Sequence, residues 1–170
     1  DISDRLRLQL QVDYVKNNPE IVLLGSFCEF IDHNNKVIGN WNSSLNHYDI
    51  INSFQHSNPF AHSSVMFDKE KVIDLGGYPI EYIYAQDLAL WINICSKYKV
   101  ANLDSALTKI RIHDKQATFD EKLLDVKIYE ERNLTKNSLT IPGMKITTKI
   151  RLLLKLISIW IGIVKNKLLN

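Results

Sequence analysis

The chain has 170 residues, of which 45% are hydrophobic and 24% charged, and its formal net charge is +2. This length is enough for one domain with a real core, and the composition excludes an intrinsically disordered chain. The small charge, with no long basic stripe through the body of the chain, excludes nucleic-acid binding driven by electrostatics. Cys28 and Cys95 form neither a disulfide framework nor a zinc motif, so a reducing compartment such as the cytoplasm fits best.

The chain begins at Asp1 with no signal segment, in a stretch typical of a helix start inside a longer protein. We therefore expect an N-terminal part to be missing from this sequence. Residues 3–17 have helical periodicity, with Ser3 or Asp1 as the expected cap and Pro19 just beyond the end. The apolar positions at four-residue spacing are Leu6, Leu10 and Tyr14.

Short strands and one short helix are expected in the next fifty residues. Residues 21–31, IVLLGSFCEFI, form a mostly apolar run that predicts a buried strand. A turn at 32–36 and a return strand at 37–39 would complete a hairpin. A short helix is plausible within 43–57, and residues 60–67, FAHSSVMF, predict a further strand.

The clearest helix of the sequence begins at Asp87. Before it we expect a short helix over 69–74, ended by Gly76 and Gly77, and then a loop over 78–85. The helix that Asp87 opens is amphipathic. Its apolar face carries Leu88, Trp91, Cys95 and Tyr98. Beyond it, the pattern predicts a strand over 100–112 and a more polar helix over 115–137.

The C-terminal segment 145–170 differs from the rest, because basic residues flank the run LLLKLISIWIGIV. The uninterrupted apolar stretch after Lys155 is about half of the ~20 residues that a membrane-spanning helix needs. A helix lying on the membrane surface, with lysines reaching the headgroups, is favoured. The alternative is a terminal helix packed on the core.

Four short motifs occur in a fixed order along residues 1–115, about two thirds of the chain. They are Asp1-Ile2-Ser3, Asn58-Pro59-Phe60 with Leu75-Gly76-Gly77-Tyr78, Tyr84-Ala85-Gln86-Asp87, and Arg111-Ile112-His113-Asp114. In this order they resemble the stretch after the metal-binding DxD, the acceptor-side block, the base motif and the closing R-x-H element of family 2 glycosyltransferases.

The resemblance implies the C-terminal part of an α/β fold, the Rossmann-like GT-A fold. Residues 1–115 would be its acceptor-binding half, 116–144 a helical extension and 145–170 a possible membrane-surface anchor. It implies inverting transfer of a sugar from a nucleotide-diphosphate donor to a hydroxyl of a glycan or lipid-linked acceptor. The richness in Lys, Asn and Ile suggests bacterial surface polysaccharide or glycolipid synthesis, at the inner face of the cytoplasmic membrane.

The resemblance makes Asp87 the catalytic base. An acceptor hydroxyl is a poor nucleophile until a carboxylate takes its proton, and a helix N-terminus favours the ionised form of that carboxylate. From the pattern alone, Asp87 is a plain N-cap, and one residue can serve both roles. The family often has an acid where Gln86 stands, so Gln86 would contact substrate without a charge.

Metal binding is implied at the two ends of the resembling region. The leaving diphosphate needs positive charge, normally Mn²⁺ or Mg²⁺. His113 matches a metal ligand, Asp1 an acidic residue of the site, and Arg111 a phosphate contact. Without the family, a lone His after a strand is more often a surface residue. Since the DxD lies outside this sequence, we expect the fragment alone to bind metal and nucleotide poorly and to be inactive.

Three further residues have two interpretations each. His62 either lines the acceptor pocket or faces solvent, Gly77 either frees the backbone near the site or caps a helix, and Trp91 either stacks on a sugar or packs in the core. The alternative function for the whole chain is a non-catalytic carbohydrate-binding or membrane-recruiting domain that kept the fold.

Overall fold

The protein is described by a computed structural model that covers residues 1–113, 116 and 121–169. Its centre is a mixed sheet with the strand order β1-β5-β2-β3, in which β4 also pairs with β2. The two central strands, β2 and β5, are parallel, and the other pairs are antiparallel. The strands are β1 (Ile2–Ser3), β2 (Ile21–Ile31), β3 (Val37–Trp41), β4 (Met66–Phe67) and β5 (Lys99–Arg111).

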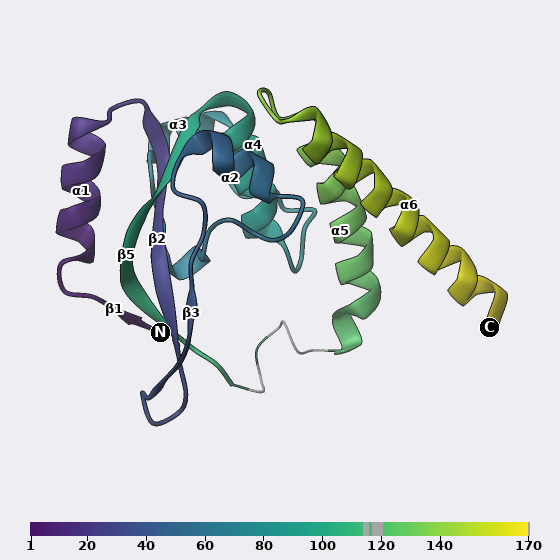
Figure 1. Ribbon diagram of the computed structural model, residues 1–170, viewed down its shortest axis with the longest axis horizontal. Helices are drawn as coiled ribbons and strands as arrows, with labels where there is room; N and C mark the ends of the chain where they lie inside the picture. The colour runs from purple at the N-terminus through teal and green to yellow at the C-terminus, as the bar shows by residue number, and fades with distance from the viewer. Residues whose placement is uncertain (114–115, 117–120, 170) are drawn as a thin grey trace.

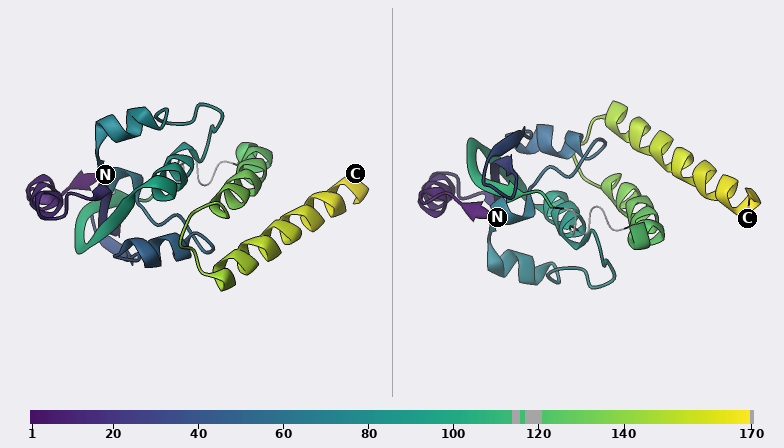
Figure 2. Two further views of the ribbon diagram at one scale, coloured as in Figure 1. Left: turned by 90° about the horizontal axis from the view of Figure 1, so that it is seen from above. Right: turned by 90° about the horizontal axis from the view of Figure 1, so that it is seen from below.

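Helices cover both faces of this sheet, as expected for an α/β fold (Figure 1). Helix α1 packs against β2 and β5 on one face, whereas α2 and α4 contact β5 from the other (Figure 2). Helix α5 packs on α4, and α6 packs on α5 and then diverges from it toward the C-terminus. The helices are α1 (Arg7–Asn17), α2 (His47–Ser53), α3 (Lys69–Asp74), α4 (Gln86–Lys97), α5 (Leu124–Ser138) and α6 (Ile146–Leu169), with short 3₁₀ turns at His62–Ser64 and Glu121–Leu123.

The core lies between β2 and α4. The apolar run of β2 is almost wholly buried, and so is the apolar face of α4. Leu23, Leu90 and Trp91 are fully enclosed. Burying side chains of this size stabilises the fold by about 1.5–3 kcal/mol each. Gln86 and Asp87 therefore begin a helix that is anchored deep in the core.

Helix α1 departs from the sequence prediction at its start and in its buried face. Residues 2–3 form β1, so the helix begins at Arg7 and neither Ser3 nor Asp1 caps it; the Asp4 carboxylate instead accepts the Leu6 N–H at 2.8 Å. Leu6 and Leu10 are exposed, and the buried residue is Gln11, whose amide donates to the Ser64 carbonyl at 2.8 Å. The buried contact is thus polar, a feature that hydrophobic periodicity cannot detect.

The predicted strand at 60–67 is mostly a turn. Only Met66–Phe67 pair with β2, and His62–Ser64 form a 3₁₀ turn that the Ser64 hydroxyl closes by donating to the Ala61 carbonyl at 2.8 Å. The polar helix expected at 115–137 begins at Leu124 as α5, after a 3₁₀ turn at 121–123. The first part of that prediction, at 115 and 117–120, lies outside the described residues.

Candidate active site

Asp87 lies in the first turn of α4, where its carboxylate is held by two hydrogen bonds. Helix α4 begins at Gln86 with Ala85 as its N-cap, so the interpretation of Asp87 as a plain N-cap is wrong. One carboxylate oxygen accepts the Leu88 N–H at 2.7 Å, and the other accepts from Asn58 Nδ2 at 3.1 Å. The side chain is half-buried. Two neutral donors thus fix its orientation and leave further lone pairs available to a substrate hydroxyl.

The Asn58 loop is anchored from the sheet. The Asn58 side-chain oxygen accepts the Phe60 N–H at 3.1 Å, and the Asn102 amide of β5 donates to the Pro59 carbonyl at 3.2 Å. Asn102 approaches β2 so closely that a Cβ on Gly25 would lie 2.1 Å from its side-chain oxygen. Only glycine leaves this space, so Gly25 allows β5 to hold the loop whose Asn58 orients Asp87.

Aromatic and polar side chains form an open depression beside the start of α4. Two sequence-predicted substrate residues, His62 and Gln86, line it together with Tyr78, and its remaining lining residues are Pro79, Ile80 and Tyr82. His62 Nε2 and the Tyr78 hydroxyl lie 2.9 Å apart. Burial, assisted by the nearby Asp87 carboxylate, raises the pKa of the Tyr78 hydroxyl. Tyr78 therefore stays protonated at neutral pH and can act as a hydrogen-bond donor.

Of the two interpretations given for Trp91 and for Gly77, the structure supports core packing for Trp91 and helix capping for Gly77. Trp91 is fully buried, with its ring centroid 5.8 Å from that of Phe60 and 5.9 Å from that of His62. A sugar cannot reach a side chain that is fully buried, so the prediction that Trp91 stacks on a sugar is wrong. Gly77 has a φ of +73° and donates its N–H to the Val72 carbonyl at 2.9 Å, which caps α3.

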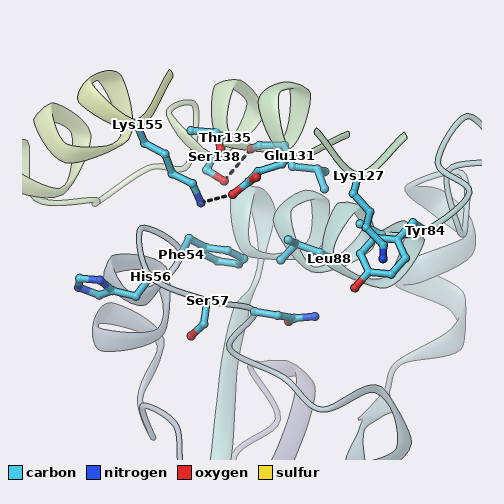
Figure 3. A pocket seen from close by; sticks show the side chains of 13 residues that line it. Phe54, His56, Ser57, Tyr84, Leu88, Lys127, Glu131, Thr135, Ser138 and Lys155 are labelled. Atoms are coloured by element: carbon cyan, nitrogen blue, oxygen red, sulfur yellow. Dashed lines mark hydrogen bonds and ion pairs between the residues drawn. The ribbon is translucent and has the colours of Figure 1, made fainter. Parts of the chain in front are cut away.

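A second hollow lies between the start of α4 and α5 (Figure 3). Its volume is about 250 Å³. Asn58, which holds Asp87, also lines this cavity, together with Tyr84 and Leu88. Helices α5 and α6 close it through the ion pair of Glu131 with Lys155, whose charged atoms are 2.9 Å apart. Its lining of phenyl, hydroxyl and charged groups was not expected from the sequence, because it combines segments up to a hundred residues apart.

Glu130 of α5 is the residue that sequence reasoning missed most completely. It is 2% exposed, and its carboxylate accepts backbone N–H groups from the residues just before α4. The Ile83 N–H lies 2.6 Å from Oε1, and the Ala85 N–H lies 2.8 Å from Oε2. No local sequence pattern predicts such a contact, because the partners are 45 to 47 residues apart.

The predicted metal and phosphate residues lie together at the end of β5. An Asp1 carboxylate oxygen accepts the Arg111 N–H at 3.1 Å. The Arg111 guanidinium donates to the Asp32 carbonyl and the Asn35 side chain in the turn between β2 and β3. His113 is exposed just beyond the strand. Across the part of the chain that the structure describes, no three His, Cys, Asp or Glu side chains are grouped so that they could hold a metal ion.

Comparison with known proteins shows similarity to bacterial glycosyltransferases. The amylovoran biosynthesis glycosyltransferase AmsE of Erwinia amylovora is 37% identical over 113 residues, which cover 65% of this chain and 41% of that protein. The O-antigen biosynthesis glycosyltransferase WbnJ of Escherichia coli is 30% identical over 118 residues, 68% of this chain and 45% of that protein. No protein-family model matches the chain.

A third relative is named for its substrates. The UDP-Gal:alpha-D-GlcNAc-diphosphoundecaprenol beta-1,3-galactosyltransferase of Escherichia coli is 26% identical over 118 residues, 69% of this chain and 42% of that protein. The chain thus spans less than half the length of each of these relatives. Together the similarities support a glycosyltransferase, and the relatives act in polysaccharide and O-antigen biosynthesis.

Proposed function

We propose that the chain is the acceptor-side part of an inverting glycosyltransferase of the family 2 type, with a GT-A fold and Asp87 as its catalytic base. The observation that carries the proposal is the state of the Asp87 carboxylate. It is half-buried and oriented by Asn58 and the Leu88 N–H. It also lies close enough to the Tyr78 hydroxyl, in the depression that His62 and Gln86 line, to help raise the pKa of that hydroxyl. A base needs this combination of fixed geometry and access.

In the proposed reaction, an acceptor hydroxyl oxygen forms a bond to the anomeric carbon of the donor sugar. The bond from that carbon to the nucleoside diphosphate breaks, and the diphosphate leaves with the electron pair. Asp87 takes the hydroxyl proton, and attack opposite the leaving group inverts the carbon. The side chains of His62 and Gln86 would hydrogen-bond other acceptor hydroxyls.

A divalent cation, Mn²⁺ or Mg²⁺, is proposed for the diphosphate side. Asp1 and His113 offer a carboxylate and an imidazole near the end of β5, and the carboxylate is the oxygen ligand that Mn²⁺ and Mg²⁺ prefer. They would supply two ligands, and other oxygens, including those of the diphosphate, the rest. When bound, the ion would neutralise charge on the leaving group. The Arg111 guanidinium would reach a phosphate only by leaving Asp32 and Asn35.

The proposed partners are a nucleotide-sugar donor and a glycan or lipid-linked acceptor used in bacterial surface polysaccharide synthesis. The relatives support this proposal, since one is named for O-antigen biosynthesis and another for a diphosphoundecaprenol acceptor. The acceptor would lie over the depression, where the Tyr78 hydroxyl, His62 and Gln86 offer hydrogen bonds and the exposed Ile80 offers an apolar surface.

The test is the Asp87→Asn substitution in the complete protein. Sugar transfer is measured by nucleotide release and product mass, with a panel of UDP-hexoses as donors and lipid-linked oligosaccharides as acceptors. General bases contribute about 10²–10⁴-fold, so we expect kcat to fall by that factor. Binding of UDP, measured by calorimetry, should be unchanged, because Asn keeps the shape of the carboxylate.

Two outcomes would count against the proposal. Transfer at the wild-type rate by the Asp87→Asn protein would remove Asp87 as the base. A wild-type protein that transfers no sugar from any donor, but binds oligosaccharide equally well with and without the substitution, would favour the non-catalytic carbohydrate-binding alternative.

We further propose that α6 places the protein on the inner face of the cytoplasmic membrane. Several large apolar side chains of α6 are about half exposed or more, and they are Ile146, Ile150, Leu153, Leu154, Ile157, Trp160 and Ile161. Residues 146–169 contain five Lys or Arg and no acidic residue, which suits anionic headgroups. No helix among the described residues is long and apolar enough to cross a membrane.

Vesicle flotation of the complete protein tests this placement. We expect binding to vesicles that contain phosphatidylglycerol and weaker binding to pure phosphatidylcholine. The pair Ile157→Ser and Trp160→Ser should reduce binding at least severalfold. The matched control is Ile73→Ser with Ile80→Ser, two exposed apolar residues outside α6. Equal flotation of all three proteins would remove the membrane proposal.

A further inference from the structure

The segment before α4 ends in three consecutive N–H groups that point at one buried carboxylate. Ile83, Tyr84 and Ala85 all donate to Glu130, at distances from 2.6 to 3.3 Å. The first N–H groups of a helix have no partner within the helix, and a side chain at the N-cap usually satisfies one of them. Here the N-cap is Ala85, whose methyl side chain cannot accept a hydrogen bond. Glu130 of α5 instead accepts the N–H of Ala85 and those of the two residues before it.

The burial of Glu130 makes this contact strong and specific. A carboxylate that is 2% exposed has lost its hydration, so it is stable only where hydrogen bonds replace that water. The donors are three consecutive backbone N–H groups, and together they satisfy both carboxylate oxygens. The backbone of residues 83–85 must keep this conformation for all three to reach Glu130. Helix α5 has four buried residues among its 15, and Glu130 is the charged one.

This contact bears on the catalytic geometry because Ala85 lies two residues before Asp87. Helix α4 begins at Gln86, immediately after Ala85. Within its first turn, the Asp87 carboxylate accepts hydrogen bonds from the Leu88 N–H and the Asn58 side chain. Releasing residues 83–85 would let the first turn of α4 fray and move the carboxylate. A displacement of about 1 Å at a reacting group can cost about 10²-fold in rate.

We propose that Glu130 is a positioning residue for the transfer reaction, which clamps residues 83–85 and thereby fixes the Asp87 carboxylate. This proposal rests on the proposed function of Asp87 as the base. It assigns α5 a specific task in the active site, although Glu130 lines neither the depression at His62 and Gln86 nor the cavity at Asn58.

The experiment uses the complete protein with Glu130→Gln and, as the matched control, Asp125→Asn, which removes the same charge from an exposed position of α5. Hydrogen exchange is followed by mass spectrometry over residues 78–90, and kcat and KM are measured for the transfer reaction. We expect faster exchange at 83–85 and a kcat lower by about 10- to 100-fold, since Gln has only one acceptor oxygen. The KM for the donor should change by less than about twofold, and Asp125→Asn should resemble the wild type.

Each other result decides against the proposal. Unchanged exchange at 83–85 would show that Glu130 is no clamp, whether or not the protein transfers sugar, so this readout stays informative if the proposed function itself fails. Faster exchange with an unchanged kcat would show a structural role only. Should Glu130→Gln fail to fold, Glu130→Asp keeps the charge but is one methylene too short to satisfy all three donors, and the same two readouts apply to it.

Discussion

The start of α4 and the end of β5 carry the two groups of residues that the sequence linked to catalysis, and they are built differently. Around Asp87 the contacts support one another. Asn58 donates to the Asp87 carboxylate, and Asn102 anchors the loop that carries Asn58. Glu130 accepts the N–H of Ala85, just before α4. At the end of β5, Asp1 bonds to a backbone N–H and Arg111 to a hairpin turn, while His113 is exposed. The described chain therefore orients the proposed base in advance, but not the proposed metal ligands.

The largest expected contrast between the two regions is in stability. Trp91→Ala removes the largest fully buried side chain of the described residues, four positions after Asp87 in α4, and should lower the free energy of unfolding by about 3–5 kcal/mol. His113→Ala at the exposed end of β5 should change it by less than about 0.5 kcal/mol. Urea unfolding followed by circular dichroism measures both. Similar small losses in the two variants would mean that the α4 region is not the better packed one.

A smaller contrast is expected in the rate of transfer. Asn58→Ala removes one donor to the Asp87 carboxylate, and a hydrogen bond to a charged group contributes about 1.5–3 kcal/mol. The kcat of the complete protein should fall by roughly 10- to 100-fold. Asn35→Ala at the other end should lower it by less than about threefold, since Arg111 keeps its bond to the Asp32 carbonyl. Equal rates in the two variants would contradict the support of Asp87 by Asn58.

The smallest effect concerns the turn that leads to Tyr78. Gly77 has a φ of +73°, where a Cβ is strained although space is free, so Gly77→Ala should destabilise the fold by about 1–2 kcal/mol. Gly162→Ala in α6, where φ is negative, should be neutral or stabilising by up to about 1 kcal/mol. Thermal unfolding compares the two. A neutral Gly77→Ala would indicate a turn that relaxes to another conformation.

The sequence predicted the elements whose signals are local. The apolar run of β2, the face of α4 and the strand β5 follow directly from periodicity, and the α/β class agrees with the structure. The order of the short motifs also indicated a glycosyltransferase, which the relatives support. Local patterns succeed here because the buried residues of β2 and α4 are close together in the sequence and apolar.

The remaining features depend on partners that are distant in the sequence. In α1 the buried residue is Gln11 and not the leucines that the periodicity indicated, because its amide donates to the Ser64 and Leu24 carbonyls. Glu130 has an ordinary position in a polar helix, and only the fold brings residues 83–85 to it. Polar contacts of this kind have no period, so the sequence patterns assigned roles to Asp87 and His62 but not to the residues that hold Asp87 in place.

The proximity of an acceptor hydroxyl to position 87 is the most direct test of Asp87 as the base. The measurement is a crystal structure of the complete Asp87→Asn protein with the donor and acceptor found in the transfer assay, where the substitution stalls the reaction. We expect the attacking hydroxyl within about 3.2 Å of the side chain at position 87, beside Asn58. A hydroxyl more than about 6 Å from that side chain, and within hydrogen-bond reach of another carboxylate, would contradict the assignment.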